Sequence, residues 1–323
     1  MPSGAGTTTA WWRHILTTIL YSHAACLEHL NLPGHPERPD RLRAIDRVLG
    51  SDGFEPLVRI EAPEADPKLF ELAHPRSHVD LIHDAVPLEG FARVDADTAI
   101  SPKSWEAVLR ATGAAVAGVD AVFSGEADNV FASVRPPGHH AEKATAMGFC
   151  LINSVAVAAR HAQRHHDAER VAIVDFDVHH GNGTQDIFYE DETVLFASSH
   201  QMPLFPGTGE LGETGAGNIF NAPLSDGDGG EVFKAAWRER ILPAVDRFGP
   251  DLIIISAGFD AHRLDPLAGI NLEAEDFDWV TGELMDLASR HCGNRIVSVL
   301  EGGYDLTGLA TSVAAHVNRL MTG

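Results

Sequence analysis

Carboxylate and imidazole side chains alternate directly after one apolar run of this sequence. Residues 171–174 read Val-Ala-Ile-Val, and Asp175, Asp177 and His179 follow at every second position. Because side chains two residues apart share a face of an extended chain, all three can point to one side. This combination is typical of a metal site, and Gly-Asn-Gly at 181–183 lets the chain turn away. The alternative is a buried strand whose end caps a helix, but burying unpaired carboxylates costs free energy.

Strand-like apolar runs alternate with helical patterns along the chain. The predicted strands are residues 15–21, 130–134, 171–174, 193–197, 252–256 and 296–300, and the predicted helices are residues 104–123, 154–165, 231–248 and 274–289. Such alternation indicates an α/β fold with a mostly parallel central sheet and helices on both of its faces. The sequence contains no long linker and no internal repeat at a fixed period, so we expect a single domain over residues 15–323, preceded by a loose leader over residues 1–14.

Polar and glycine-rich segments follow five of the predicted strands. They are residues 135–140, 175–183, 198–209, 257–262 and 301–304. In an open α/β sheet, ligands bind beyond the carboxyl ends of the strands. Five such strand ends predict an active site along that edge of the sheet.

Two carboxylates and an imidazole on neighbouring strand ends offer a ligand set for a metal ion. A catalytic zinc needs three protein ligands and one position open to water, and Asp177, His179 and Asp260 supply three ligands. Fe²⁺ and Co²⁺ also suit such ligands, and a two-metal site is the less favoured alternative. Other histidines, among them His74 and His78, are interpreted as surface or capping residues.

Two adjacent histidines offer proton transfer beside this metal. His139 and His140 follow a stiff Pro-Pro-Gly turn, and we expect one imidazole to take a proton from water while the other stabilises or donates. Asp175 and Asn182 are the candidates to orient these two rings. Tyr304, which follows two glycines, is the candidate to stabilise an oxyanion. The set predicts a metal-assisted amide or ester hydrolase.

Charge and cysteine content restrict the partners and the compartment. The chain has 24 basic and 46 acidic residues, a formal net charge of −22, which disfavours direct contact with nucleic acid and favours cationic partners. Without an apolar run of about 18 residues, no membrane span is predicted. Cys26, Cys150 and Cys292 have neither disulfide nor metal-site spacing, so we expect a reducing compartment, the cytoplasm.

Five dispersed motifs resemble the zinc-dependent histone deacetylase superfamily. They are Pro-Gly-His-His-Ala at 137–141, Asp-Phe-Asp-Val-His-His-Gly-Asn-Gly at 175–183, Phe-Pro-Gly-Thr-Gly at 205–209, Gly-Phe-Asp-Ala at 258–261 and Glu-Gly-Gly-Tyr at 301–304. His-Pro-Glu-Arg-Pro-Asp-Arg-Leu at 35–42 resembles the class II and bacterial branch, which includes histone deacetylase-like and acetylpolyamine amidohydrolases. The resemblance covers residues 15–310 and implies an arginase/deacetylase-like fold that hydrolyses an acylated amine.

The resemblance implies a role for each residue that matches a motif. The catalytic and zinc-binding residues that it implies are His139, His140, Asp175, Asp177, His179, Asn182, Asp260 and Tyr304. It pairs His139 with Asp175 and His140 with Asn182, and it gives the second histidine the main role as base and acid. One zinc ion per chain is implied, and a structural K⁺ or Na⁺ ion is compatible with the resemblance.

A second group of residues matches the substrate tunnel of the superfamily. Phe149, which follows Gly148, and Phe205 match the two aromatic walls around an acyl-lysine chain. Leu267 matches a residue at the tunnel rim. Asp97 is the candidate rim carboxylate that accepts N–H groups of the substrate backbone.

Three functions remain open at this stage. The first is a deacylase of acyl-lysine side chains, the second a hydrolase of acetylpolyamines or other small amides, and the third a non-catalytic module that binds acyl-lysine. The net charge of −22 favours polyamines and Leu267 at the rim disfavours them. The complete set of ligands, histidines and tyrosine disfavours the non-catalytic module. A homo-oligomer remains open.

Overall fold

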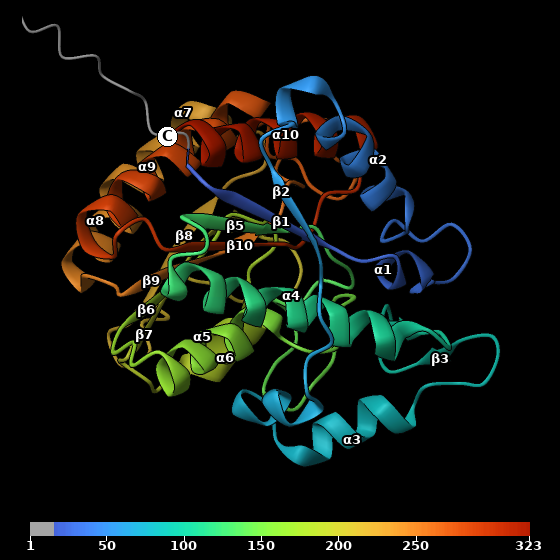
Figure 1. Ribbon diagram of the computed structural model, residues 1–323. Coiled ribbons are helices and arrows are strands. Elements are labelled where there is room, and N and C mark those ends of the chain that lie inside the picture. Colours follow the sequence, from blue (N-terminus) through green and yellow to red (C-terminus); the bar gives the residue numbers. More distant parts are fainter. Residues whose placement is uncertain (1–15) are drawn as a thin grey trace, which may run out of the picture.

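A computed structural model describes residues 16–323 and arranges them around one eight-stranded sheet (Figure 1). The strands are Thr18–Ser22 (β1), Val58–Glu61 (β2), Asn129–Ala132 (β5), Val171–Asp175 (β6), Val194–Gln201 (β7), Ile219–Leu224 (β8), Leu252–Ala257 (β9) and Ile296–Leu300 (β10). Their order is β2-β1-β5-β10-β9-β6-β7-β8, and every neighbouring pair is parallel. A separate antiparallel pair joins Ala92–Arg93 (β3) to Ala99–Ile100 (β4). The predicted leader over residues 1–14 lies outside the described residues.

Helices cover both faces of the sheet, as the alternating pattern predicts. They are Ala25–Glu28 (α1), Asp40–Leu49 (α2), Arg76–Asp84 (α3), Ser104–Ser124 (α4), Ser154–His165 (α5), Asn182–Phe188 (α6), Gly230–Ala236 (α7), Leu242–Phe248 (α8), Ala274–His291 (α9) and Leu306–Thr322 (α10). Short 3₁₀ segments occupy Asp52–Phe54 and Pro67–Leu72, and a π-helical turn, Trp237–Ile241, joins α7 to α8. In Figure 1, α2, α7, α8, α9 and α10 lie on one side of the sheet and α3, α4, α5 and α6 on the other.

The central strands are apolar because the helices bury both of their faces. Every residue of β6, β9 and β10 is buried, and these strands consist mainly of valine, isoleucine, leucine and alanine. A parallel strand that is covered on both sides has no face on which polar residues meet water. This is why all three appear in the sequence as continuous apolar runs rather than as alternating patterns.

The apolar sequence pattern does not predict the two edge strands of the sheet. Strands β2 and β8 are edge strands, and neither is predicted. Residues of β2 are mostly exposed, and β8 contains Pro223, so both depart from the apolar pattern of the centre. Strand β7 continues to Gln201, beyond the predicted end at residue 197, because its polar last residues are buried by tertiary contacts. Helices α1, α2, α3, α6 and α10 are also absent from the prediction.

Helix α4 has the length and apolar composition of a helix that could cross a membrane. However, 67% of that stretch is buried within the molecule, where α4 packs against α5, β5 and β10. Gly118 shows how close this packing is, since a Cβ atom there would lie 3.1 Å from side-chain carbons of both Val130 and Val297. The apolar residues of α4 therefore serve packing against the sheet.

A buried ion network ties the N-terminal segment to the loop after β5. Glu37 and Arg135 are fully buried, and both Nε and Nη2 of Arg135 donate to the Glu37 carboxylate, the second at 2.6 Å. Arg41, also buried, donates to Glu37 at 3.1 Å. Although burial favours the protonated acid, the charge of Arg135 holds the pKa of Glu37 well below its ordinary value. The carboxylate therefore stays charged between two guanidinium groups.

The same network reaches the loop after β10. Arg41 donates from Nε to the carbonyl of Gly303 at 2.6 Å and from Nη2 to the carbonyl of Glu301 at 2.5 Å. Its guanidinium carbon also lies 5.0 Å from the centre of the Tyr304 ring. The buried charges therefore fix the backbone that carries Tyr304.

We expect Glu37→Gln to lower the free energy of unfolding by about 3–5 kcal/mol, because it leaves the buried Arg135 without its charged partner. Urea unfolding followed by circular dichroism measures the change. Glu71→Gln, which removes one partner of an exposed pair with Arg76, is the control and should cost less than about 1 kcal/mol. Equal effects of the two substitutions would contradict the role of the network.

Candidate active site

The five polar segments that follow predicted strands meet at one edge of the sheet. Strands β5, β10, β9, β6 and β7 are contiguous in the sheet, and because they are parallel their carboxyl ends lie side by side. The loops that leave these ends carry the predicted metal ligands, the tandem histidines, Tyr304 and Phe205. The fold therefore brings together residues that are up to 165 positions apart, such as His139 and Tyr304.

Asp177, His179 and Asp260 are buried and converge on one point. One ligand atom from each lies within 4.8 Å of the others. The Nδ1 atom of His179 is 3.1 Å from Asp177 Oδ1 and 3.1 Å from Asp260 Oδ2. A tetrahedral zinc ion with bonds of about 2.0–2.1 Å holds its ligand atoms about 3.3 Å apart. Donor types and separations therefore fit a zinc ion.

Glycines make room for the two carboxylates. A Cβ atom at Gly258 would lie 2.0 Å from Asp177 Oδ2, and one at Gly302 would lie 2.1 Å from Asp260 Oδ2. The Gly302 N–H donates to Asp177 Oδ2 at 2.8 Å, and the Val178 N–H donates to Asp260 Oδ1 at 2.8 Å. Only glycine allows the backbone to come this close, which explains why Gly258 and Gly302 directly follow β9 and Glu301.

The charges of this group favour a positive ion at its centre. Burial alone would lower the pKa of His179, but the hydrogen bonds to Asp177 and Asp260 raise it to about 10. The same pair of carboxylates would attract a divalent cation. The three residues can therefore hold a metal ion as well as a proton.

A second cluster among the described residues, Asp120, His161 and His166, differs from this group. The Nε2 atoms of His161 and His166 lie 2.7 and 2.6 Å from the same Oδ1 atom of Asp120. Both distances are shorter than the two separations of 3.1 Å around His179 and than the separation of about 3.3 Å in a tetrahedral metal site. The contacts tie the end of α5 to α4, and hydrogen bonding explains them without a metal.

The tandem histidines contact the two partners that the sequence predicts. His139 Nδ1 lies 3.0 Å from Asp175 Oδ2, and His140 Nδ1 lies 2.8 Å from Asn182 Oδ1. The two ring centres are 4.0 Å apart. All four residues are buried, so each imidazole has its Nδ1 atom fixed by one partner.

The surroundings shift the pKa values of the two imidazoles in opposite directions. Burial lowers the pKa of both rings. For His139 the negative charges of Asp177 and Asp175 outweigh burial, so its pKa lies well above the ordinary value. For His140 the neighbouring charges of His139 and His179 add to burial, so its pKa lies well below the ordinary value. The surroundings therefore favour the charged form of His139 and the neutral form of His140.

Two buried carboxylates outside the predicted catalytic set hold the loops of the site. Glu301 accepts backbone N–H groups of Gly138 at 2.6 Å and His139 at 3.1 Å, and burial raises its pKa to about 7. Asp265 accepts the N–H groups of Tyr304 at 2.7 Å and Leu267 at 3.0 Å. An acidic residue directly after an apolar strand, as Glu301 is, was the available sign of such a role.

The predicted substrate residues line one cavity together with parts of the chemical site. The cavity has a volume of about 240 Å³. It is lined by Asp97, His140, Gly148, Phe149, His179, Leu204, Phe205, Leu267 and Tyr304. Leu204, which is not among the predicted substrate residues, completes the apolar wall. The cavity therefore has apolar sides, and its polar lining consists of the candidate metal ligand His179, the imidazole of His140 and the phenol of Tyr304.

The wall at Gly148 and Phe149 has an unusual backbone. Both residues have positive φ, 57° and 69°, and a Cβ atom at Gly148 would lie 2.5 Å from the His140 ring. The Phe149 N–H donates to the Thr98 hydroxyl at 3.0 Å, which helps to hold this strained conformation. Asp97 Oδ1 accepts the Thr98 hydroxyl at 2.9 Å and the Gly148 N–H at 3.3 Å. The exposed Asp97 therefore supports the wall that it borders.

His74 and His78 correct a prediction, because both are buried rather than at the surface. Their rings stack at 4.7 Å, His74 Nε2 accepts the Asn153 N–H at 2.9 Å, and His78 Nε2 donates to the Leu151 carbonyl at 2.9 Å. Burial lowers the pKa of His74 to about 4, so the ring stays neutral. The two histidines thereby fix the far end of the segment that carries Phe149.

Comparison with known proteins places this chain among histone deacetylases. Residues 35–320 match the histone deacetylase domain. The chain is 39% identical over 299 residues to the histone deacetylase-like amidohydrolase of Pseudomonas aeruginosa, covering 87% of this chain and 78% of that protein. It is 38% identical over 300 residues to a probable deacetylase of Archaeoglobus fulgidus, covering 91% and 83%.

A solved structure has the same architecture. The crystal structure of the HDA15 HD domain superimposes with a TM-score of 0.90 at 38% sequence identity, covering 95% of this chain and 88% of that one. The family that the motifs resemble and the fold that they imply are both confirmed. This chain belongs to the histone deacetylase family and is a hydrolytic deacetylase that acts on amide bonds.

Proposed function

We propose that this protein is a zinc-dependent hydrolase that removes acyl groups, acetyl in the first place, from lysine-like amines. The observation that carries the proposal is the cavity of about 240 Å³, which is bordered by His140, His179 and Tyr304 and has apolar walls. Such walls suit the methylene chain of a lysine, and the polar groups suit its acyl amide. The histone deacetylase-like relatives support the same substrate class.

Asp177, His179 and Asp260 are the residues that would hold one Zn²⁺ ion per chain. When bound, the ion supplies a Lewis acid that polarises the acyl carbonyl and lowers the pKa of water. Their donor set also accepts Fe²⁺ or Co²⁺, which are the alternative metals. A structural K⁺ or Na⁺ ion remains a prediction from the family resemblance.

The catalytic roles follow from the protonation that the surroundings favour. His140, held neutral, takes a proton from the attacking water and later gives it to the leaving amine. His139, held charged beside Asp175, provides positive charge beside the reacting atoms. Burial raises the pKa of Tyr304 well above its ordinary value, so the phenol stays protonated and donates a hydrogen bond to the developing oxyanion.

Substrate binding falls to the other residues that line the cavity. Phe149, which follows Gly148, and Phe205 form the walls around the aliphatic chain, and Leu267 lies at the rim. One oxygen of the exposed Asp97 already accepts protein donors, and its second oxygen would accept an N–H group of the substrate. The exposed Asp97 and the net charge of −22 also suit an acetylpolyamine, which is the second candidate substrate.

The setting of this activity is proposed on composition and resemblance. We assign residues 15–323 to one catalytic domain of the class II-like bacterial branch, acting in the cytoplasm. The net charge of −22 argues against direct nucleic-acid binding, and no membrane association is proposed. A homo-oligomer is compatible with these features. A non-catalytic acyl-lysine module is the least favoured function, because the chain keeps both histidines and Tyr304.

Zinc-loaded protein should hydrolyse acetyl-lysine peptides faster than longer acyl-lysines, acetylputrescine or acetylspermidine. Turnover of all four substrate types, measured by amine release, tests the assignment. A preference for acetylspermidine of about tenfold or more, equivalent to about 1.4 kcal/mol, would favour the polyamine function instead. Negligible turnover of the whole panel would contradict the deacylase proposal.

Asp177→Asn should abolish the bound zinc and lower turnover by more than about 100-fold, because loss of groups that merely orient metal ligands already costs about 10–100-fold. Chelation of the wild-type protein should have the same effect, with recovery on adding Zn²⁺. Metal analysis and turnover measure both results. Asp52→Asn, at an exposed carboxylate, is the control and should keep metal and activity.

Tyr304→Phe should lower kcat by about 10²–10³-fold with little change in KM, because the phenol donates mainly to charge that develops in the transition state. Steady-state kinetics with an acetyl-lysine peptide give both constants, and metal analysis checks that zinc content is unchanged. A variant with the wild-type kcat would remove the oxyanion role that we give to Tyr304.

A further inference from the structure

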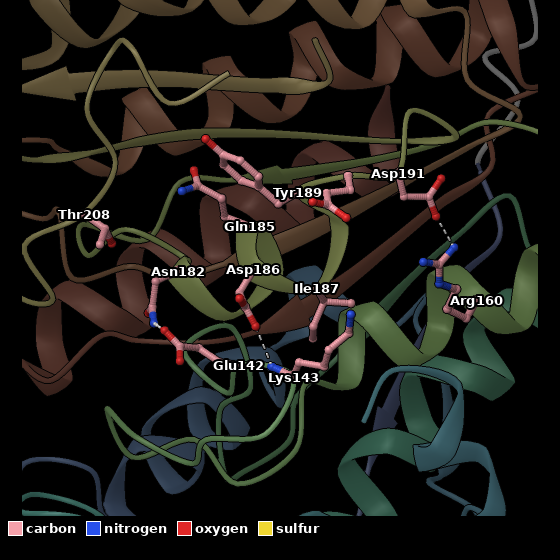
Figure 2. Close-up of a pocket in the computed structure, with 11 residues that line it drawn as sticks. Glu142, Lys143, Arg160, Asn182, Gln185, Asp186, Ile187, Tyr189, Asp191 and Thr208 are labelled. Carbon is pink, nitrogen blue, oxygen red and sulfur yellow. Dashed lines mark hydrogen bonds and ion pairs between the residues drawn. The ribbon is translucent and has the colours of Figure 1, made fainter. Parts of the chain in front are cut away.

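Asn182 connects the tandem histidines to a carboxylate on its other side. The Oδ1 atom of Asn182 lies 2.8 Å from His140 Nδ1, and its Nδ2 atom donates to Glu142 Oε1 at 2.8 Å. Figure 2 shows the contact between Glu142 and Asn182 at the wall of a polar pocket of about 560 Å³. Asn182 is buried and Glu142 is half-buried, so the carboxylate closes a chain of contacts that begins at His140.

The partners of Asn182 decide which way its amide faces. An amide has an oxygen that accepts and an NH₂ group that donates, and it can present either to a neighbouring imidazole. A carboxylate only accepts, so Glu142 requires the NH₂ group on its own side. The second hydrogen of that group points toward the Met147 sulfur, a weak acceptor, 3.4 Å from Nδ2. The oxygen of Asn182 therefore faces His140.

This orientation determines where neutral His140 carries its proton. Because Asn182 offers an acceptor, the Nδ1 atom of His140 must donate, and the lone pair of the neutral ring then lies on Nε2. If the amide turned over, its NH₂ group would face Nδ1 and the proton would move to Nε2. The ring would then have no free nitrogen with which to take a proton from water.

We propose that Glu142 is a positioning residue that fixes the tautomer of His140 through the amide of Asn182. The inference rests on the proposed role of His140 as the base and deepens it. His139 needs no such third residue, because its partner Asp175 is itself a carboxylate that can only accept. The amide at Asn182 lacks this property, and Glu142 supplies it.

Ion pairing does not account for the position of Glu142. Lys143 and Arg160 line the same pocket, yet among residues 16–323 no basic side chain lies within ion-pair distance of Glu142. Arg160 instead pairs with Asp191, as Figure 2 shows. The contact of its carboxylate with Asn182 is therefore the feature to test.

Glu142→Lys tests the proposal by replacing an acceptor with a donor. The lysine favours the Asn182 oxygen on its own side, which turns the NH₂ group toward His140. We expect the His140 proton to move from Nδ1 to Nε2 in ¹⁵N–¹H spectra of zinc-loaded, histidine-labelled protein. We also expect kcat to fall by about 10²–10⁴-fold with little change in KM, the usual effect of losing a general base.

Two further variants keep the test decisive if the lysine disturbs folding. Glu142→Gln can present either an acceptor or a donor to Asn182, so its loss of kcat should be smaller. Combining Asn182→Asp with Glu142→Lys restores an acceptor beside His140 and should recover the Nδ1-protonated tautomer and most of kcat.

Glu190→Lys is the matched control. It makes the same charge change at an exposed residue of the same pocket and should leave both the tautomer and kcat unchanged.

The outcomes separate this inference from the proposed function. An unchanged tautomer in Glu142→Lys and Glu142→Gln would overturn the positioning role, whatever happens to activity. A loss of kcat that the double variant does not recover would also overturn it, because a merely structural defect behaves in that way. Failure of the wild-type protein on every substrate would instead contradict the deacylase function, while the spectra would still decide the role of Glu142.

Discussion

Asp177 and Asp260 are two buried carboxylates that approach the same imidazole, and the rest of the site is arranged around this burial. Charges in such a position need donors or counter-charges, because the interior solvates them poorly. The donors are backbone N–H groups of Gly302 and Val178 and the ring of His179. A side chain at Gly258 or Gly302 would collide with these carboxylates, so their burial requires glycine in two loops. The same concentration of negative charge makes the point suitable for a divalent cation.

Three further buried carboxylates hold the loops that surround Asp177 and Asp260. Glu301 fixes the backbone of the tandem histidines, and Asp265 fixes that of Tyr304 and Leu267. Glu37 lies further from the metal ligands and contacts two guanidinium groups, one of which donates to a carbonyl of the loop after β10. These acids accept from backbone N–H groups, arginines and Asn31, and none of them lines the cavity beside Tyr304. The positions of the residues that line the cavity therefore depend on carboxylates that take no part in the reaction.

The sequence predicts the centre of the molecule better than its periphery, for physical reasons. Buried parallel strands such as β6, β9 and β10 are recognisable because both faces are apolar, and parallel order then brings their polar ends together. The edge strands β2 and β8 lack this pattern. The burial of Glu37 depends on Arg135, 98 positions away, and the burial of His74 depends on the loop around Asn153. Contacts between residues so far apart leave no local pattern in the sequence.

The contrast between the two tandem histidines explains why an amide and a carboxylate are both useful at this site. Asp175 contacts His139 directly, and its negative charge contributes to raising the pKa of that ring. A carboxylate in direct contact with His140 would likewise raise the pKa of that ring, unless a neighbouring cation offset its charge. An amide orients the ring without adding charge, but an amide alone can turn over. Placing Glu142 beyond Asn182 fixes the direction of the amide while keeping the negative charge one residue further from His140. The orientation of the His140 ring and the charge beside it are thereby controlled by two different residues, whereas a single carboxylate would determine both.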